Sequence, residues 1–150
     1  MLRELNNTQI DDLLKSQLVG RIGCHSDGIT YVVPVNYIYD GSNIYSHAAK
    51  GMKIDLMRKN PEVCFEVDDI KETTNWQSAI VWGTFEEITA IDEQQNIMQK
   101  LSDRIMPTII DDSIPPSHGF ADKESDVGTN NELIVYKIIL SKKTGRFEKR

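Results

Sequence analysis

Two Asp-Gly pairs, each set between runs of β-branched and aromatic residues, constrain the fold of this chain more than any other feature. They are Asp27-Gly28 and Asp40-Gly41. Glycine accepts the positive φ that the tight turn of a two-residue hairpin demands, and aspartate is a common first partner in such turns. Residues 19–47 are therefore predicted to form a three-stranded antiparallel meander.

The rest of the chain alternates between helical and extended periodicity. Helices are predicted from a cap at Asn7 or Thr8 to a stop at Gly20, over residues 51–60 and over residues 92–105; strands are predicted over residues 62–68, 78–88 and 132–140. Trp76 is assigned to a loop, and residues 141–150 to a basic tail. Six strands joined mainly by hairpins favour a mainly β (α+β) fold, a closed or half-closed antiparallel barrel with flanking helices, in one domain over residues 1–150.

Composition excludes several classes of protein. The formal net charge of −6 argues against broad binding to nucleic acid, because such binding needs a basic face. The N-terminus lacks the layout of a signal peptide, and no apolar run approaches the roughly 20 residues of a membrane helix. We therefore expect a cytoplasmic protein without a membrane partner. Cys24 and Cys64 stand alone in strand-like runs, so neither a metal site nor a disulfide is indicated.

Pro34 interrupts the predicted middle strand, "TYVVPVNYIY". Proline donates no hydrogen bond to a sheet, so it belongs at an edge or a bulge. There, the backbone groups of Val33 and Val35 are expected to face something other than a neighbouring strand.

A basic corner follows the meander, in the stretch "IYSHAAKGMKIDLMRKNP". Ser46 offers a hydroxyl, His47 an imidazole, and Lys50 and Lys53 two ammonium groups where a strand passes into a helix. Gly51 lets the backbone come close, and the start of the helix presents free N–H groups. This set suits an anion such as phosphate. The alternative is that both lysines are solvated surface charges and His47 is a structural residue.

Several segments, in order, carry a resemblance to a known family. They are "GRIG", "YVVPVNYIYDGSNIYSHAA", "KIDLMRKNP", "CFEVD", "IVWGTFEEI" and "GRF". Together they resemble the pyridoxamine 5'-phosphate oxidase-like split-barrel flavoproteins, and more narrowly the branch that includes nitroimidazole-resistance proteins. The resemblance implies a six-stranded split barrel of the FMN-binding type. It also implies a homodimer with FMN in the groove between the two barrels.

The resemblance assigns cofactor-binding roles by position. The strand beside the flavin ring would be formed by Val33, Pro34, Val35, Asn36 and Tyr37. The phosphate end would be formed by Ser46, His47, Ala48, Lys50 and Lys53, with Lys53 as the foremost candidate for the phosphate contact. Trp82 either reaches the flavin of the partner subunit or is a core or interface residue.

The activity implied is that of a flavin-dependent oxidoreductase, which reduces a small-molecule acceptor such as a nitro compound or quinone with an NAD(P)H-type reductant. The Arg-rich motif of true pyridoxamine-phosphate oxidases is not evident apart from Arg146, so vitamin B6 oxidation is not expected. No catalytic acid, base or nucleophile is identified; His25 and His118 are weak candidates, and residues 107–131 are predicted to be a long loop that could act as a lid.

Two alternatives remain open at this point. One is a non-catalytic dimeric split barrel that holds FMN, FAD or haem, with His47 as the haem ligand. The other is a barrel dimer without a cofactor.

Overall fold

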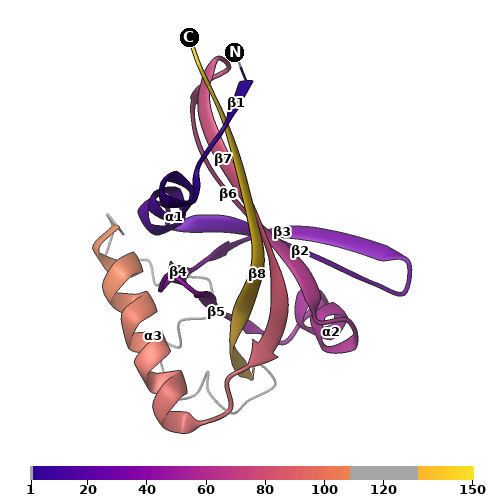
Figure 1. Cartoon of the computed structure of the whole chain (residues 1–150). Helices are drawn as coiled ribbons and strands as arrows, with labels where there is room; N and C mark the ends of the chain where they lie inside the picture. Colours follow the sequence, from indigo (N-terminus) through magenta and orange to yellow (C-terminus); the bar gives the residue numbers. More distant parts are fainter. Residues whose placement is uncertain (1, 109–131) are drawn as a thin grey trace.

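The computed structural model describes residues 2–108 and 132–150, and the predicted 107–131 loop with His118 lies almost entirely outside them. The described chain is built on one antiparallel sheet of eight strands (Figure 1). The strands are β1 (Leu2–Glu4), β2 (Val19–Ser26), β3 (Ile29–Asn36), β4 (Ile38–Tyr39), β5 (Asn43–Ala49), β6 (Glu62–Glu72), β7 (Asn75–Glu87) and β8 (Leu133–Lys149). Their order is β3-β2-β6-β7-β8-β5-β4, with β1 added to β8. The sheet is not closed, because β3 and β4 lie at its two ends.

Both Asp-Gly hairpins are confirmed. Asp27 has φ 54° and Gly28 φ 77° in the β2–β3 turn, and Gly41 has φ 100° in the β4–β5 turn. The three-stranded meander, however, is wrong. The predicted middle strand breaks at Tyr37, so that β3 pairs with β2 and β4 pairs with β5 at the other end of the sheet. A single residue, Tyr37, thus joins the strands at the two ends of the sheet order.

The sheet has more and longer strands than the six predicted. β6, β7 and β8 form a long ribbon that carries the chain termini and the β6–β7 hairpin at one end of the molecule (Figure 1). Trp76 therefore lies in β7 and not in a loop, and the predicted basic tail is the second half of β8. Much of the ribbon is exposed on both faces, so its strands carry charged residues on both sides. They therefore lack the alternation of apolar and polar residues from which a strand is predicted.

Three helices flank the sheet: α1 (Asn7–Ser16), α2 (Met52–Lys59) and α3 (Ile91–Ile105), with a short 3-10 turn, η1 (Met106–Thr108). The predictions of α2 and α3 are confirmed. The cap of α1 is Asn6, just before the predicted cap at Asn7 or Thr8, and the helix ends at Ser16 and not at the predicted stop, Gly20, which lies in β2. The side chains of Asn6 and Gln9 each accept a 2.8 Å hydrogen bond from the other's backbone N–H, which is a complete capping box.

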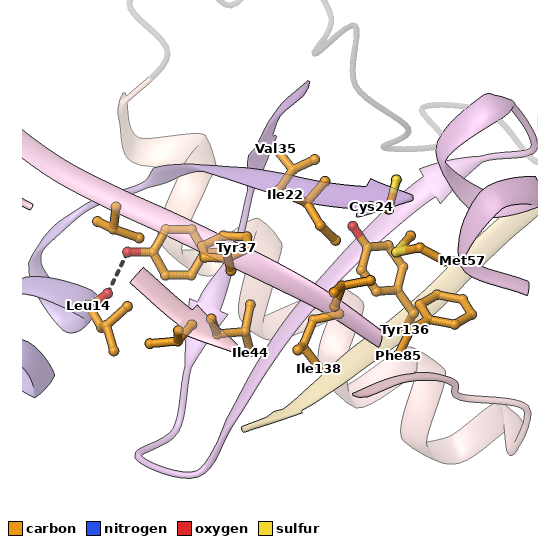
Figure 2. Packing of buried hydrophobic residues seen from close by; sticks show 14 of the residues in the cluster. Leu14, Ile22, Cys24, Val35, Tyr37, Ile44, Met57, Phe85, Tyr136 and Ile138 are labelled. Carbon is orange, nitrogen blue, oxygen red and sulfur yellow. Dashed lines mark hydrogen bonds between the residues drawn. The ribbon is translucent and has the colours of Figure 1, made fainter. Parts of the chain in front are cut away.

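The inner face of the sheet encloses the main core. Tyr37 and Phe65 meet edge to face with ring centroids 5.0 Å apart, and Phe85 and Tyr136 are 5.3 Å apart. The hydroxyl of Tyr37 donates a 2.5 Å hydrogen bond to the carbonyl of Leu14 on α1 (Figure 2). A second cluster lies under α3, where Ile97 and Leu101 pack with Ile88 and Val135.

In the part of the chain that the structure describes, no helix has both the length and the apolar character needed to cross a bilayer.

Candidate functional site

Two strand edges face each other across the point where the sheet fails to close. Among the described residues, the strand ladders join β3 to β2 alone and residues 46–49 of β5 to β8 alone. We call the gap between β3 and this part of β5 the split. A hydrogen bond from the Ser46 hydroxyl to the main-chain carbonyl of Asn36, at 2.6 Å, bridges it. The sheet is thus interrupted within the segments expected to bind a cofactor.

Pro34 lies on the edge strand, as predicted, opposite Arg21 of β2. The backbone groups of this strand that face away from β2 are not the predicted ones. The N–H of Tyr37 bonds to Leu18, and bonding alternates along an antiparallel strand, so the groups of Val33 and Val35 point toward β2. The groups that face the split belong to Val32, Pro34 and Asn36 instead.

The same alternation identifies the β5 groups that face the split. Asp40 N–H bonds to the Asn43 carbonyl at 3.2 Å, and Tyr45 stands opposite Ile38 in the same ladder. Two and four residues beyond Tyr45, the backbone groups of His47 and Ala49 point the same way, toward the split. Backbone groups therefore face the split from both sides.

The side chains of the predicted cofactor strand divide between the core and the surface. Pro34 is exposed, whereas Val35 and Tyr37 are buried in the core. Because the Tyr37 hydroxyl is bonded to Leu14, its side chain does not reach the split. Burial also raises the pKa of Tyr37 well above its usual range.

Ser46 and His47 are the two buried polar residues among those described, and Ala48 is buried beside them. Tyr136 of β8 stands directly opposite Ser46. Burial raises the pKa of Tyr136 to about 12, and the Ser46 hydroxyl opposes that rise. The phenol thus stays protonated beside the serine that bridges the split. Tyr136 is not predictable from the sequence, because only the β5–β8 register reveals it.

The basic corner lies at one end of the split, where β5 leads into α2. Gly51 caps α2 without a side-chain hydrogen bond, so the first-turn N–H groups have no side-chain acceptor from the cap. Lys50 is exposed and Lys53 is half-buried. Lys59 and Asn60, at the other end of α2, bond to Asp27 and to the His25 carbonyl, both at 2.8 Å, and so fasten the helix to the β2–β3 hairpin.

Lys53 makes no ion pair or hydrogen bond with any residue that the structure describes, although burial lowers the pKa of its ammonium group. Its electrostatic neighbour is Cys24, whose own pKa is raised by burial and by Cys64 and is lowered by Lys53. Both cysteines are free thiols. A half-buried cation without a counter-charge is unfavourable by itself and fits a site for an anionic group.

Trp82 lies on the other face of the sheet, between the buried Val81 and Gly83. α2 packs on the inner face through Ile54 and Met57, so one chain does not bring Trp82 and Lys53 together. The centroid of the Trp82 ring lies 5.2 Å from the ammonium group of Lys142, a contact that depends on the pairing of β7 with β8. A groove of about 490 Å³ runs beside the ring, and its lining includes Val32, Cys64 and Ser141.

Known proteins share this arrangement. The sequence model of the family described as pyridoxamine 5'-phosphate oxidase matches residues 6–128. An uncharacterised protein of Rhizobium meliloti (strain 1021) is 28% identical over 89 residues, and the match covers 59% of this chain and 59% of that relative's length.

Solved structures agree with the family match. The crystal structure of an FAD-binding protein from Mesorhizobium loti superimposes with a TM-score of 0.76, 25% identity and 99% of both chains covered. A protein from Bacteroides thetaiotaomicron, described as a candidate 5-nitroimidazole antibiotic resistance protein, gives a TM-score of 0.72 at 18% identity, covering 98% of this chain and 87% of its own. The predicted relationship is thereby confirmed: this chain belongs to the pyridoxamine 5'-phosphate oxidase family and has its split-barrel type of fold.

Proposed function

We propose that the protein binds FMN and acts as a flavin-dependent oxidoreductase on a small-molecule acceptor, as a homodimer with the flavin at the subunit interface. The observation that carries the proposal is Lys53, a half-buried cation without a described counter-charge at the end of the split. Flavin binding is further supported by the similar Mesorhizobium loti protein, which is described as FAD-binding.

The phosphate would bind at the start of α2. Lys53 supplies a charge that is only partly solvated, Lys50 supplies a second and exposed charge, and the uncapped first turn supplies N–H donors. Ala48 and Ala49 are small, which leaves room for a sugar-like chain between this end and the split. FMN ends in one phosphate, which matches a compact site, so we favour FMN over FAD.

The flavin ring would lie along the edge of β3. The backbone groups of Val32, Pro34 and Asn36 on one side of the split, and of Ala49 on the other, can hydrogen-bond to its polar edge. When bound, the flavin supplies the redox chemistry by accepting and donating hydride or electrons. The residues of this chain bind it, orient it and fix the electrostatics around it.

The acceptor would be a nitro compound, a quinone or a similar molecule, with NAD(P)H as the reductant. Support for a nitro compound comes from the likeness to the Bacteroides thetaiotaomicron protein, whose description names 5-nitroimidazole resistance. None of the described residues stands out as a catalytic acid or base, so position and electrostatics are the contribution we assign to the protein.

The experiment is a flavin titration of the wild-type protein and of Lys53→Glu, followed by flavin fluorescence, with FMN and FAD compared. Lys53→Glu places a carboxylate beside the phosphate and should weaken FMN binding at least tenfold, which corresponds to about 1.4 kcal/mol. Lys59→Met, a charge change on the same helix at a residue paired with Asp27, is the control and should bind like wild type. Equal affinity of wild type and Lys53→Glu would remove Lys53 from the site.

A further inference from the structure

A groove of about 550 Å³ lies between α3, the β4–β5 hairpin and the C-terminal end of α1. We call it the α3 groove, and Figure 1 shows α3 lying beside β4 and β5. Its floor is apolar, because Ile38 and Tyr45 stand opposite each other in the β4–β5 ladder and pack in the cluster that contains Ile97 of α3. A groove of this volume can hold a small organic molecule.

One end of the α3 groove is basic. Lys100 and Arg104 are four residues apart on the face of α3 that lines the groove, and Lys15 of α1 lines the same end. Like charges at this spacing on a helix destabilise each other. Neither lysine ammonium group makes an ion pair with any residue that the structure describes, and Asp11, one turn before Lys15, is paired with Lys143 at 2.9 Å. An anion in the groove would relieve this accumulation of positive charge.

Arg104 has a structural role that accounts for only part of its guanidinium group. It donates to the carbonyls of Lys15 and Gln17, the latter at 2.9 Å, and so caps the end of α1. Its Nε is buried and has no hydrogen-bond partner among the described residues. A buried N–H group without an acceptor is unfavourable. The cap also leaves Lys100 unexplained, because that side chain is exposed and bonds to no described residue.

The other end of the α3 groove is acidic. Glu93 lies about three turns before Arg104, roughly 16 Å away along the axis of α3. The Tyr45 hydroxyl donates a 2.9 Å hydrogen bond to Asp40, which lines the groove as well. Burial raises the pKa of Tyr45, and the charges of Asp40 and Glu93 add to that rise, so both acids lie near this hydroxyl. The groove is therefore polarised along its length, with an apolar floor between its two ends.

We propose that the α3 groove binds a small aromatic carboxylate, with its carboxylate among Lys100, Arg104 and Lys15 and its ring over Ile97 and Tyr45. Lys100 lies one turn beyond Ile97, about 4.5 Å along the helix axis, which suits a carboxylate attached directly to a bicyclic ring. The acids at the far end would repel a second negative charge, so the site should prefer a monocarboxylate to a dicarboxylate.

This site goes beyond the proposed function and does not depend on it. Tyr45, which lines the α3 groove, and Ser46, which bridges the split, are neighbours on β5. Their side chains point to opposite faces of the strand, so the groove and the split use different side chains.

The test is calorimetric titration of the protein, with and without FMN, using 1-naphthoate as the probe. Lys100→Glu should weaken the binding of 1-naphthoate roughly tenfold or more, because it replaces an attractive charge with a repulsive one. 1-Naphthylmethanol, which has the ring without the charge, should bind more weakly to wild type and be unaffected by Lys100→Glu. Gln95→Glu places a carboxylate at an exposed position on the opposite face of α3 and is the matched control, which should bind like wild type.

The remaining outcomes contradict the inference. No binding of 1-naphthoate by wild type, full affinity in Lys100→Glu, or an equal loss in Gln95→Glu would each overturn it. An equal loss of 1-naphthylmethanol would show that the variant altered the shape of the groove and not its charge. Amide NMR of wild type needs no variant: 1-naphthoate should shift signals of residues 93–104 and of the β4–β5 hairpin, and shifts confined to β3 and the start of α2 would assign the probe to the split.

Two variants separate this inference from the flavin proposal. Lys100→Glu should keep FMN affinity and lose 1-naphthoate affinity, which also shows that the variant is folded. Lys53→Glu should do the reverse. A protein that binds 1-naphthoate in this way but no flavin would contradict only the flavin proposal, whereas one that binds flavin but no 1-naphthoate would contradict only the α3 groove.

Discussion

The Ser46 hydroxyl donates a 2.6 Å hydrogen bond to the main-chain carbonyl of Asn36, across the split that separates β5 from β3. Ser46 is buried, with 1% of its surface exposed. This contact holds the two facing strand edges in a defined relation, on which a site between them would depend.

Ser46→Ala should therefore affect both stability and binding. The Asn36 carbonyl loses its partner in a buried place, which should lower the free energy of unfolding by about 1 to 2 kcal/mol. Flavin affinity should fall as well, because the width of the split is no longer fixed. Urea unfolding and FMN titration measure the two effects. Ser16→Ala, which removes an exposed hydroxyl bonded to the Leu13 carbonyl, is the matched control and should change neither quantity by much. Full stability of Ser46→Ala would show that the bridge contributes nothing.

Tyr37→Phe should separate a structural role from a binding role. The change removes the hydrogen bond to the Leu14 carbonyl inside the core and should lower the free energy of unfolding by about 1 to 3 kcal/mol. Flavin affinity should stay the same, because the side chain does not reach the split. Tyr31→Phe serves as control, since the Tyr31 hydroxyl makes no hydrogen bond to the part of the chain that the structure describes. Weaker FMN binding by a stable Tyr37→Phe protein would place this side chain in the site after all.

Gly83 lies against β8, at the shift in the β7–β8 register. A Cβ at this position would lie 2.3 Å from the Ile139 carbonyl oxygen, which is backbone and has no room to move. Gly83→Ala should therefore cost about 3 kcal/mol of stability through strain at the bulge in β8. At Gly51 the nearest atom would be 3.9 Å away, so Gly51→Ala should change stability by less than about 1 kcal/mol. Thermal unfolding compares the two, and equal melting temperatures would contradict the packing at Gly83.

The Asp11–Lys143 ion pair, with a 2.9 Å contact, should make stability depend on pH at both extremes. Burial acts to raise the pKa of Asp11, but hydrogen bonds from Lys143 and Tyr39 outweigh it, so the pKa lies below its usual 3.8. That stabilisation is present above pH 4 and is lost as the pH falls through the lowered pKa. The pKa of Lys143 is raised above 10.5 by Asp11, so its contribution is lost only when the pH rises beyond that value.

Asp11→Asn should flatten both ends of the profile. The effect should be below about 1 kcal/mol, because both side chains are partly exposed and solvent screens the pair. Urea unfolding of wild type and Asp11→Asn between pH 2 and 11 measures it. Parallel profiles for the two proteins would show that the pair adds nothing.

Local chemistry was enough to predict the hairpin turns at Asp27-Gly28 and Asp40-Gly41, the ends of α2 and the amphipathic α3. What it could not supply is pairing between strands that are distant in the sequence. The break of the middle strand at Tyr37 depends on two separate pairings, that of β3 with β2 and that of β4 with β5. The length of β8 depends on its partners β7 and β1. Neither leaves a periodic signal when both faces of a strand are exposed.

The candidate site also has a part that the local sequence predicts and a part that depends on strand pairing. Ser46, Ala48 and Lys53 are close in the sequence, so one short stretch was enough to propose an anion site. The backbone groups assigned to Val33 and Val35 were wrong by one residue, because the direction of each group follows from the register with β2. The flavin contact of Trp82 stays a prediction, and its position on the outer face and its contact with Lys142 come from the pairing of β7 with β8.

The central claim is that the split and the start of α2 together bind a flavin. The most direct test is the visible absorption spectrum of the protein, purified without added cofactor and again after incubation with excess FMN and desalting. We predict two broad flavin bands in the second sample, at a ratio near one flavin per chain, and their loss in Lys53→Glu. A protein that remains colourless after FMN, or that shows the Soret band of haem instead, would contradict the account.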